Sequence, residues 1–371
     1  MKNKLLVTTA LISGLLTGSS FAQTTVTGDL ALTYNALNKK LPTGLSTRGI
    51  GRETQLNIQN KGKLNNGMDY AAGFALEFDG TGSSAITVAT AADQSVTNEN
   101  VYIDLISGDT TFTIGVDHIQ RGYAGAAPQI VNITDQMAGA GSSTTFVIGA
   151  GTSESAGVGI MQKIPQAGIT ASAFYAPRSK DTGVGDMNAL VGNSGANSSY
   201  EVGINGVNTL GVKGLTVVAF YNSMAKSQST FSGDVVGKQY GVGYNFGQFA
   251  IGIDKLIDKN NNLAGATTNN ALGESAEGIT RDTRRMAVSF AVTPTFTVAL
   301  VEAKTDVSDR VTSAATGFNG TETVRALQAG YNLGPVAVTA SHNRFTNLAG
   351  RTGAVATDDG SLSILRLTTK F

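Results

Sequence analysis

Apolar and polar residues alternate along much of the chain, in segments of about ten residues. The clearest segment runs from Met68 to Phe78: Phe74 and its second neighbours are apolar, whereas Asp69 and Glu77 belong to the opposite face. Successive side chains of a β-strand point to opposite sides. The pattern therefore predicts strands that have one apolar face and one polar face.

The alternation recurs often enough to account for nearly the whole chain after residue 25. Sixteen segments carry it: Val26–Tyr34, Leu56–Ile58, Met68–Phe78, Val101–Leu105, Phe112–Val116, Val158–Ile160, Ile169–Ala173, Tyr200–Ile204, Leu215–Tyr221, Tyr240–Phe246, Phe249–Ile253, Met286–Val292, Phe296–Leu300, Leu327–Leu333, Val336–Ala340 and Ser361–Phe371. Phe146-Val147-Ile148, within Ser143–Gly151, is an alternative strand that would raise the count to eighteen or shift the sixth strand.

Short and long connections alternate between these segments, which favours a membrane barrel over a soluble sandwich. Strands of about ten residues, tilted near 45°, span a bilayer with short turns on one side and long loops on the other. The face rich in Gly, Thr, Asn and carboxylates could not fill a dry core. The last strand also needs partners on both edges, because hydrocarbon offers none to free backbone groups. We expect an all-β fold, a transmembrane antiparallel β-barrel of sixteen strands.

The amino terminus has the pattern of an export signal. Lys2 and Lys4 precede an apolar core, Leu5 to Leu16, and a small-x-small cleavage site ends at Ala22. The apolar core is too short for a transmembrane helix. We therefore expect residues 1–22 to be a signal peptide for the Sec pathway and residues 23–371 to form the barrel.

Composition narrows the possible chemistry. Removing residues 1–22 leaves 25 basic and 27 acidic residues, a formal charge of −2, so the chain lacks the basic surplus of a nucleic-acid binder. Without cysteine it can form neither disulfides nor thiolate metal sites. We expect no cofactor and no nucleic-acid partner.

Two other motifs are weak. Asp258, Asn260 and Asn262 begin like a calcium loop, but the turn glycine and the bidentate glutamate that such a loop needs are missing. His342 stands next to Ser341 without a G-x-S-x-G nucleophile elbow. A polar loop and a non-catalytic protein are the simpler interpretations.

An export signal followed by Thr-Val-Thr-Gly-Asp-Leu, sixteen alternating segments and a final Thr-Thr-Lys-Phe371 resembles the general diffusion porins of Gram-negative outer membranes. The resemblance implies a homotrimer in the cell outer membrane, with short periplasmic turns and long outer loops. It implies a water-filled pore for passive diffusion of small hydrophilic solutes and ions. It also implies contacts with the lipid bilayer and lipopolysaccharide, and recognition of Phe371 by the barrel-assembly machinery.

The resemblance further implies that the third loop, about residues 120–154, folds into the pore. Its acidic residues would face basic residues of the wall across the constriction. The candidates are, on the acidic side, Asp117, Asp135 and Glu154, and, on the basic side, Arg52, Arg121, Arg285 and Arg366. Arg52 is out of phase with the polar face unless a bulge intervenes.

Two alternative functions remain open from the residues. A substrate-selective channel, for a sugar or an organic anion, would need an aromatic path, and the inward aromatics Tyr102, Phe174 and Phe220 are few and scattered. A secreted adhesive β protein would instead be freely soluble.

Overall fold

A computed structural model describes residues 23–39, 46–77, 97–116, 156–176, 198–224, 235–259, 279–309, 320–347 and 359–371. These residues form sixteen strands, in chain order β1 Gln23–Lys39, β2 Ser46–Lys63, β3 Asp69–Glu77, β4 Thr97–Ser107, β5 Thr110–Val116, β6 Ala156–Ile164, β7 Ile169–Ala176, β8 Ser199–Val207, β9 Leu215–Met224, β10 Val235–Phe246, β11 Phe249–Lys259, β12 Ile279–Thr293, β13 Phe296–Asp309, β14 Thr321–Asn332, β15 Val336–Thr346 and β16 Gly360–Lys370. Short 3-10 turns at Pro165–Ala167 and Thr209–Gly211 lie between β6 and β7 and between β8 and β9.

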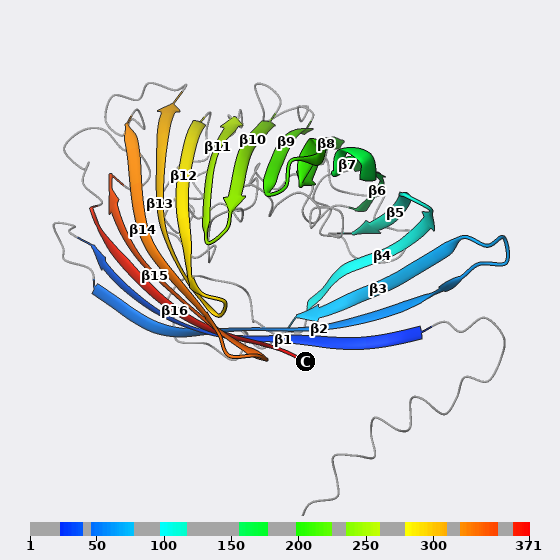
Figure 1. Cartoon of the computed structure of the whole chain (residues 1–371), viewed down its shortest axis with the longest axis horizontal. Coiled ribbons are helices and arrows are strands. Elements are labelled where there is room, and N and C mark those ends of the chain that lie inside the picture. Colours follow the sequence, from blue (N-terminus) through cyan, green and yellow to red (C-terminus); the bar gives the residue numbers. More distant parts are fainter. Residues whose placement is uncertain are drawn as a thin grey trace, which may run out of the picture.

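Each strand pairs antiparallel with the next, and β16 returns to pair with β1, so the sheet is a closed barrel. In Figure 1 the colours run around the ring from blue β1 to red β16, which lies beside β1. Because β5 pairs directly with β6 (Thr113 opposite Gly159), no further strand fits between them. The predicted sixteen-strand barrel is confirmed, and the eighteen-strand alternative is wrong.

The two faces predicted from the alternation are also present. On β4 and β5, Ile103 and Ile114 are each 53% exposed, whereas Thr113 is 1% exposed. Residues that pair across neighbouring strands point to the same face of the sheet. The exposed apolar residues of one strand therefore pair with those of the next, all around the ring. The apolar phase is the outer face of the barrel, and the opposite phase lines the lumen.

Aromatic rings gather on the outer face near the short turns. The ring centroids of Phe246 and Phe249 lie 5.8 Å apart, and Phe249 is 4.7 Å from Phe290. Phe296 meets Tyr331 edge-on at 6.2 Å. Such rings are typical of the interfacial girdle of a membrane barrel.

Short turns connect the strands at one end of the barrel. The turn between β10 and β11 has two residues, and the φ of Gly247, 71°, lies in the left-handed range that glycine adopts most readily. From the printed bounds, seven connections of two to seven residues alternate with eight of six to 39 residues. The alternation expected from the sequence is therefore present.

Several strands are longer than the ten residues that the alternation predicts. β1 has 17 residues, β2 18 and β12 15. Strands of nine to eleven residues already cross a bilayer. On β12 the extra residues lie at the end with the longer connection, where Thr280, Asp282 and Arg284 take the outward phase.

Two of the expected segments lie outside the described residues: the signal peptide, residues 1–22, and the third loop, residues 120–154, with its Phe146-Val147-Ile148. In the described part of the chain, no helix has the length and apolar character needed to cross a membrane.

The seam between β1 and β16 depends on a glycine. The N–H of Gly28 donates to the backbone oxygen of Phe371 at 2.8 Å, and the N–H of Phe371 donates to the oxygen of Gly28 at 2.9 Å. A Cβ atom built on Gly28 collides with the Phe371 ring, so the ring lies directly on the glycine. Gly28 thus lets the last residue complete the barrel wall.

We predict that Gly28→Leu destabilises the barrel, because the leucine displaces Phe371 from the seam. Overpacking of this kind costs about 1–3 kcal/mol. Heating the folded protein and following its gel mobility should give a lower unfolding temperature. Gly51→Leu is the matched control, since the nearest atom to a Cβ there is 4.0 Å away. Equal unfolding temperatures for both variants would contradict the role of Gly28.

Candidate functional site in the barrel lumen

Charged and amide side chains line the inner face. They alternate along each strand with the apolar residues of the outer face, so they point to the other side of the sheet. Charged residues of this phase include Asp29, Glu53, Lys61, Lys63, Asp69, Asp104, Lys163, Glu201, Asp254, Arg281, Arg285, Glu322, Arg366 and Lys370. Both signs are present, so no single charge dominates. On β13–β15 the same inward phase also holds an apolar cluster, made of Val301, Ala303, Val324, Ala326 and Phe345.

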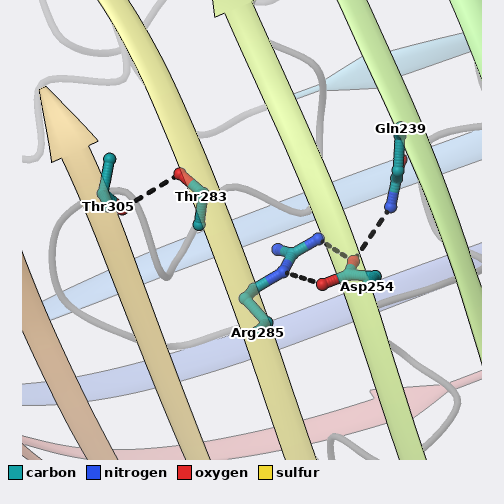
Figure 2. Close-up of polar contacts among 5 residues, drawn as sticks. All are labelled: Gln239, Asp254, Thr283, Arg285 and Thr305. Carbon is teal, nitrogen blue, oxygen red and sulfur yellow. Dashed lines mark hydrogen bonds and ion pairs between the residues drawn. The ribbon is translucent and has the colours of Figure 1, made fainter. Parts of the chain in front are cut away.

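Two buried charges, Arg285 and Asp254, belong to a cluster on three adjacent strands, β10 to β12. Arg285 donates from Nε to Oδ1 of Asp254 at 2.8 Å and makes a second, short contact from its Nη2 to Oδ2. Gln239 donates from Nε2 to Oδ2 of Asp254 at 3.2 Å. Figure 2 shows both donors pointing at the carboxylate between them. The side chains of Arg285 and Asp254 are only 4% and 3% exposed, and the bidentate pairing compensates their desolvation.

The cluster continues along the wall through hydroxyl groups. The hydroxyls of Thr283, on β12, and Thr305, on β13, lie 2.9 Å apart in the same inward phase (Figure 2). Arg285 and Thr283 are two residues apart on β12, so they share the face. The inner wall at β10–β13 therefore carries two sets of polar contacts on one face, and two bonds to Asp254 hold Arg285 in place.

A second ion pair crosses the seam of the barrel. Nη2 of Arg366, on β16, lies 2.5 Å from Oε2 of Glu53, on β2, across the intervening β1. The side chains are 20% and 51% exposed, so this pair is far more accessible than that of Arg285. It places one cation and one anion on the lumen wall.

Of the four basic residues predicted for the pore wall, the structure brings two into the lumen phase, Arg285 and Arg366. Arg52 is opposite Leu32 in an unbroken register between β1 and β2, on the outer face. Its assignment to the wall is corrected: no bulge shifts the phase, and its neighbour Glu53 faces inward instead. Arg121 lies outside the described residues, as do the predicted acids Asp117, Asp135 and Glu154.

The structure describes only part of the weak calcium motif. Asp258 lies near the end of β11, while Asn260 and Asn262 lie outside the described residues. No group of three or more metal-ligating side chains occurs in the described part of the chain.

The inward aromatic rings are packed against glycines of the neighbouring strand. Phe220 covers Gly203, and Phe174 covers Gly157. The two rings are 7% and 6% exposed. Tyr102 contacts Gly73 and accepts a short hydrogen bond from Gln59. These rings fill the wall and form no continuous aromatic path.

Glu53, Asp254 and Gln239 are among the lumen residues that sequence reasoning missed. The sequence could have predicted the position of Glu53. It lies two and four residues before Gln55 and Asn57, so it points to the same polar face of the strand. No local signal marks Asp254 as the partner of Arg285, because they are 31 residues apart and meet only through the strand register.

A closed barrel with an apolar outer face and a polar, charged inner wall is a transmembrane channel protein. The family model described as Gram-negative porin matches residues 7–349. The chain belongs to the Gram-negative porin family, and it forms an outer-membrane pore for passive diffusion.

Solved structures share the fold at low sequence identity. A loop-deletion mutant of OmpT, an outer membrane protein of Vibrio cholerae, is 13% identical, with a TM-score of 0.62 over 94% of this chain and 99% of that chain. A mutant of the Rh. blastica porin is 13% identical, with a TM-score of 0.56 over 94% of this chain and 100% of that chain. A triple mutant of the Rhodopseudomonas blastica porin is 14% identical, with a TM-score of 0.55 over the same shares. No curated protein matches the chain.

We predict that Arg285→Met destabilises the barrel strongly, because it leaves the Asp254 carboxylate buried without its cation. Breaking a buried pair costs about 3–5 kcal/mol. Adding Asp254→Asn should restore most of the loss, measured by denaturant unfolding in detergent. The exposed counterpart Arg366→Met is the control and should cost at most about 1 kcal/mol. A loss for Arg285→Met no larger than that of the control would contradict this account.

Proposed function

We propose that this porin admits small hydrophilic solutes and ions without binding a particular substrate. The observation that supports this is the inner wall: charges of both signs and amides line it, while its aromatic rings are packed against glycines. A barrel of sixteen strands is wide enough for an aqueous channel. A sugar-selective path would need exposed inward rings, so the general pore is the better-supported function.

The charge bias of the pore is proposed to come from opposed charges at its narrowest part. Asp117, Asp135 and Glu154, in and around the third loop, would form the acidic side. Arg285 and Arg366 from the wall, with Arg121 at the start of the loop, would form the basic side. Rings of fixed charge bias which ions pass. Arg366 is the more accessible of the two wall arginines.

The remaining features of the proposal follow from the family resemblance. Residues 1–22 would be removed after Sec export, and Phe371 would be read by the barrel-assembly machinery. The barrel would assemble as a homotrimer in contact with the bilayer and lipopolysaccharide. A passive channel needs neither a cofactor nor catalytic residues, and we expect no enzymatic activity.

The function is tested by electrical recording. Detergent-purified protein added to a planar bilayer should give stable, step-like increases of conductance, grouped in threes for a trimer. Heat-unfolded protein is the control. A bilayer that stays silent with folded, purified protein would rule out the pore.

We further predict the direction of change for two lumen variants. Arg366→Gln removes a fixed cation, so the reversal potential in a potassium chloride gradient should move toward the potassium value. Glu53→Gln should move it toward the chloride value. Arg52→Gln makes the same chemical change on the outer face and should leave it unchanged. A shift for Arg52→Gln equal to that for Arg366→Gln would contradict the assignment of faces.

A further inference from the structure

β1 extends further toward the short turns than β16, the strand that pairs with it across the seam. The pairing of β16 with β1 covers Asp29–Lys39. Phe371 then adds two backbone hydrogen bonds to Gly28, which are the last contacts of the seam in the described structure. β1 begins five residues before Gly28, and Figure 1 shows it continuing past the end marked C. Within the described residues, Gln23–Thr27 therefore pair with β2 alone.

Other hairpins at this end of the barrel are hydrogen-bonded to their neighbours down to the turns. The N–H of Asn245, at the end of β10, donates to the oxygen of Gly214 in the turn before β9, at 2.9 Å. The N–H of Ala291, on β12, donates to the oxygen of Gln248 in the turn before β11, at 2.8 Å. At the seam, by contrast, the ladder stops five residues before the end of β1.

The alternation of an antiparallel ladder shows which backbone groups point to the open side of β1. Gly28 uses both its N–H and its oxygen toward β16, so the residues two and four positions before it, Val26 and Thr24, point the same way. Thr25 and Thr27 point toward β2. In the described structure, the open side therefore presents two N–H donors and two C=O acceptors.

The residues of this edge suit strand pairing. Many natural sheet edges are protected by charge, proline or a bulge. Residues 24–27 are Thr-Thr-Val-Thr, four β-branched residues in a row, which favour an extended backbone. They contain no charge and no proline, and they pair with β2 in an unbroken register. The edge is therefore straight and ready to accept another strand.

The two faces of the edge differ, and the difference specifies the side chains of a partner strand. On the outer face, Val26 is 51% exposed and Phe371 is 70% exposed. On the inner face, Thr25 and Thr27 alternate with Val26, and Lys61 on β2 shares their phase. A strand that pairs here therefore needs apolar side chains in one phase and polar side chains in the other.

A second copy of this chain cannot occupy the edge by antiparallel pairing. Two copies inserted the same way in a membrane present their β1 strands in the same direction. Antiparallel pairing of β1 with β1 would require one copy to be inverted. An extended segment of a different polypeptide has no such restriction, and it satisfies all four backbone groups at their natural spacing.

We propose that Gln23–Thr27 form a docking edge for an extended segment of a periplasmic polypeptide, which adds a strand beside β1 beyond Phe371. The inference rests on the proposed orientation of the barrel, with its short turns in the periplasm. Main-chain hydrogen bonds to Thr24 and Val26 hold the segment, and the alternation of apolar and polar side chains selects it, as in other cases of β-strand addition.

The test uses the full-length folded protein in detergent and a fluorescent peptide, Thr-Val-Thr-Val-Thr, whose binding is read by anisotropy. Val26→Pro removes an N–H from the open side without breaking a bond to β2, and its ring obstructs the partner. Binding should weaken about tenfold. Val26→Ala is the matched control, since it keeps the N–H and should retain most of the affinity. Bound peptide should also slow the amide hydrogen exchange of Thr24 and Val26.

A control on the side of the ligand does not depend on the folding of any variant. The same peptide with N-methyl groups on alternate backbone nitrogens cannot donate to the edge and should not bind. Binding of the methylated peptide as tight as that of the unmodified one would overturn the proposal. So would equal affinity of wild type and folded Val26→Pro, or no saturable binding to wild type up to about 1 mM peptide.

The side of the membrane is tested separately, which the absence of cysteine makes simple. A single Thr24→Cys should react with a maleimide on a polyethylene glycol too large for the pore only after the outer membrane is opened. Labelling of intact cells would place the edge outside and overturn the periplasmic partner.

Conductance separates this proposal from the pore function. Val26→Pro should conduct like wild type, because Val26 is in the outward phase. Silence of the wild-type protein in bilayers would count against the pore, while the peptide titration would still decide whether the docking edge exists.

Discussion

A backbone that crosses hydrocarbon must satisfy every N–H and C=O within the protein, and the rest of this structure depends on that constraint. The sheet meets it only because β16 returns to β1. The closing bonds reach the last residue, where Phe371 and Gly28 exchange two backbone hydrogen bonds. Closure explains why a residue without a side chain stands opposite the Phe371 ring. A side chain at Gly28 would separate the two strands that complete the ring.

Because the sheet is closed and its side chains alternate between faces, the charged residues of the strands divide into an inward set and an outward set. Residues of one parity meet the lumen, where Arg285, Asp254 and Gln239 form a fixed polar cluster. Residues of the other parity face outward, where Arg284 and Lys304 share a face with Met286 and Leu300. Neighbours in sequence therefore belong to different environments. Arg284 and Arg285 are adjacent, yet one faces outside and the other is locked in the wall, so the effect of a substitution depends on its parity.

Much of this could be predicted from the sequence. The number of strands and their two faces follow from period-2 alternation, since both depend on side chains within a single strand. The order around the ring follows from the short turns and from the need to close the sheet. The assignment of Arg52 to the lumen was wrong although the answer was present: Arg52 shares the parity of the apolar residues Leu56 and Ile58. Cross-strand partners could not be predicted. The pairing of Asp254 with Arg285 depends on the register between β11 and β12, which the composition of neither strand specifies.

The length of the strands determines where the inward and outward charges lie relative to the apolar belt. A barrel of ten-residue strands would end at the edge of the apolar belt, and both faces would become loop there. Here β12 and β13 continue for 15 and 14 residues, so ordered sheet extends past that edge. The added residues hold Arg284 and Lys304 opposite each other on the outside, and Arg281 and Thr283 on the inside. Rigid strands keep like charges opposite one another where loops would let them separate. The carboxylates of Asp282 and Glu302, which take the same outward phase, offset part of that repulsion.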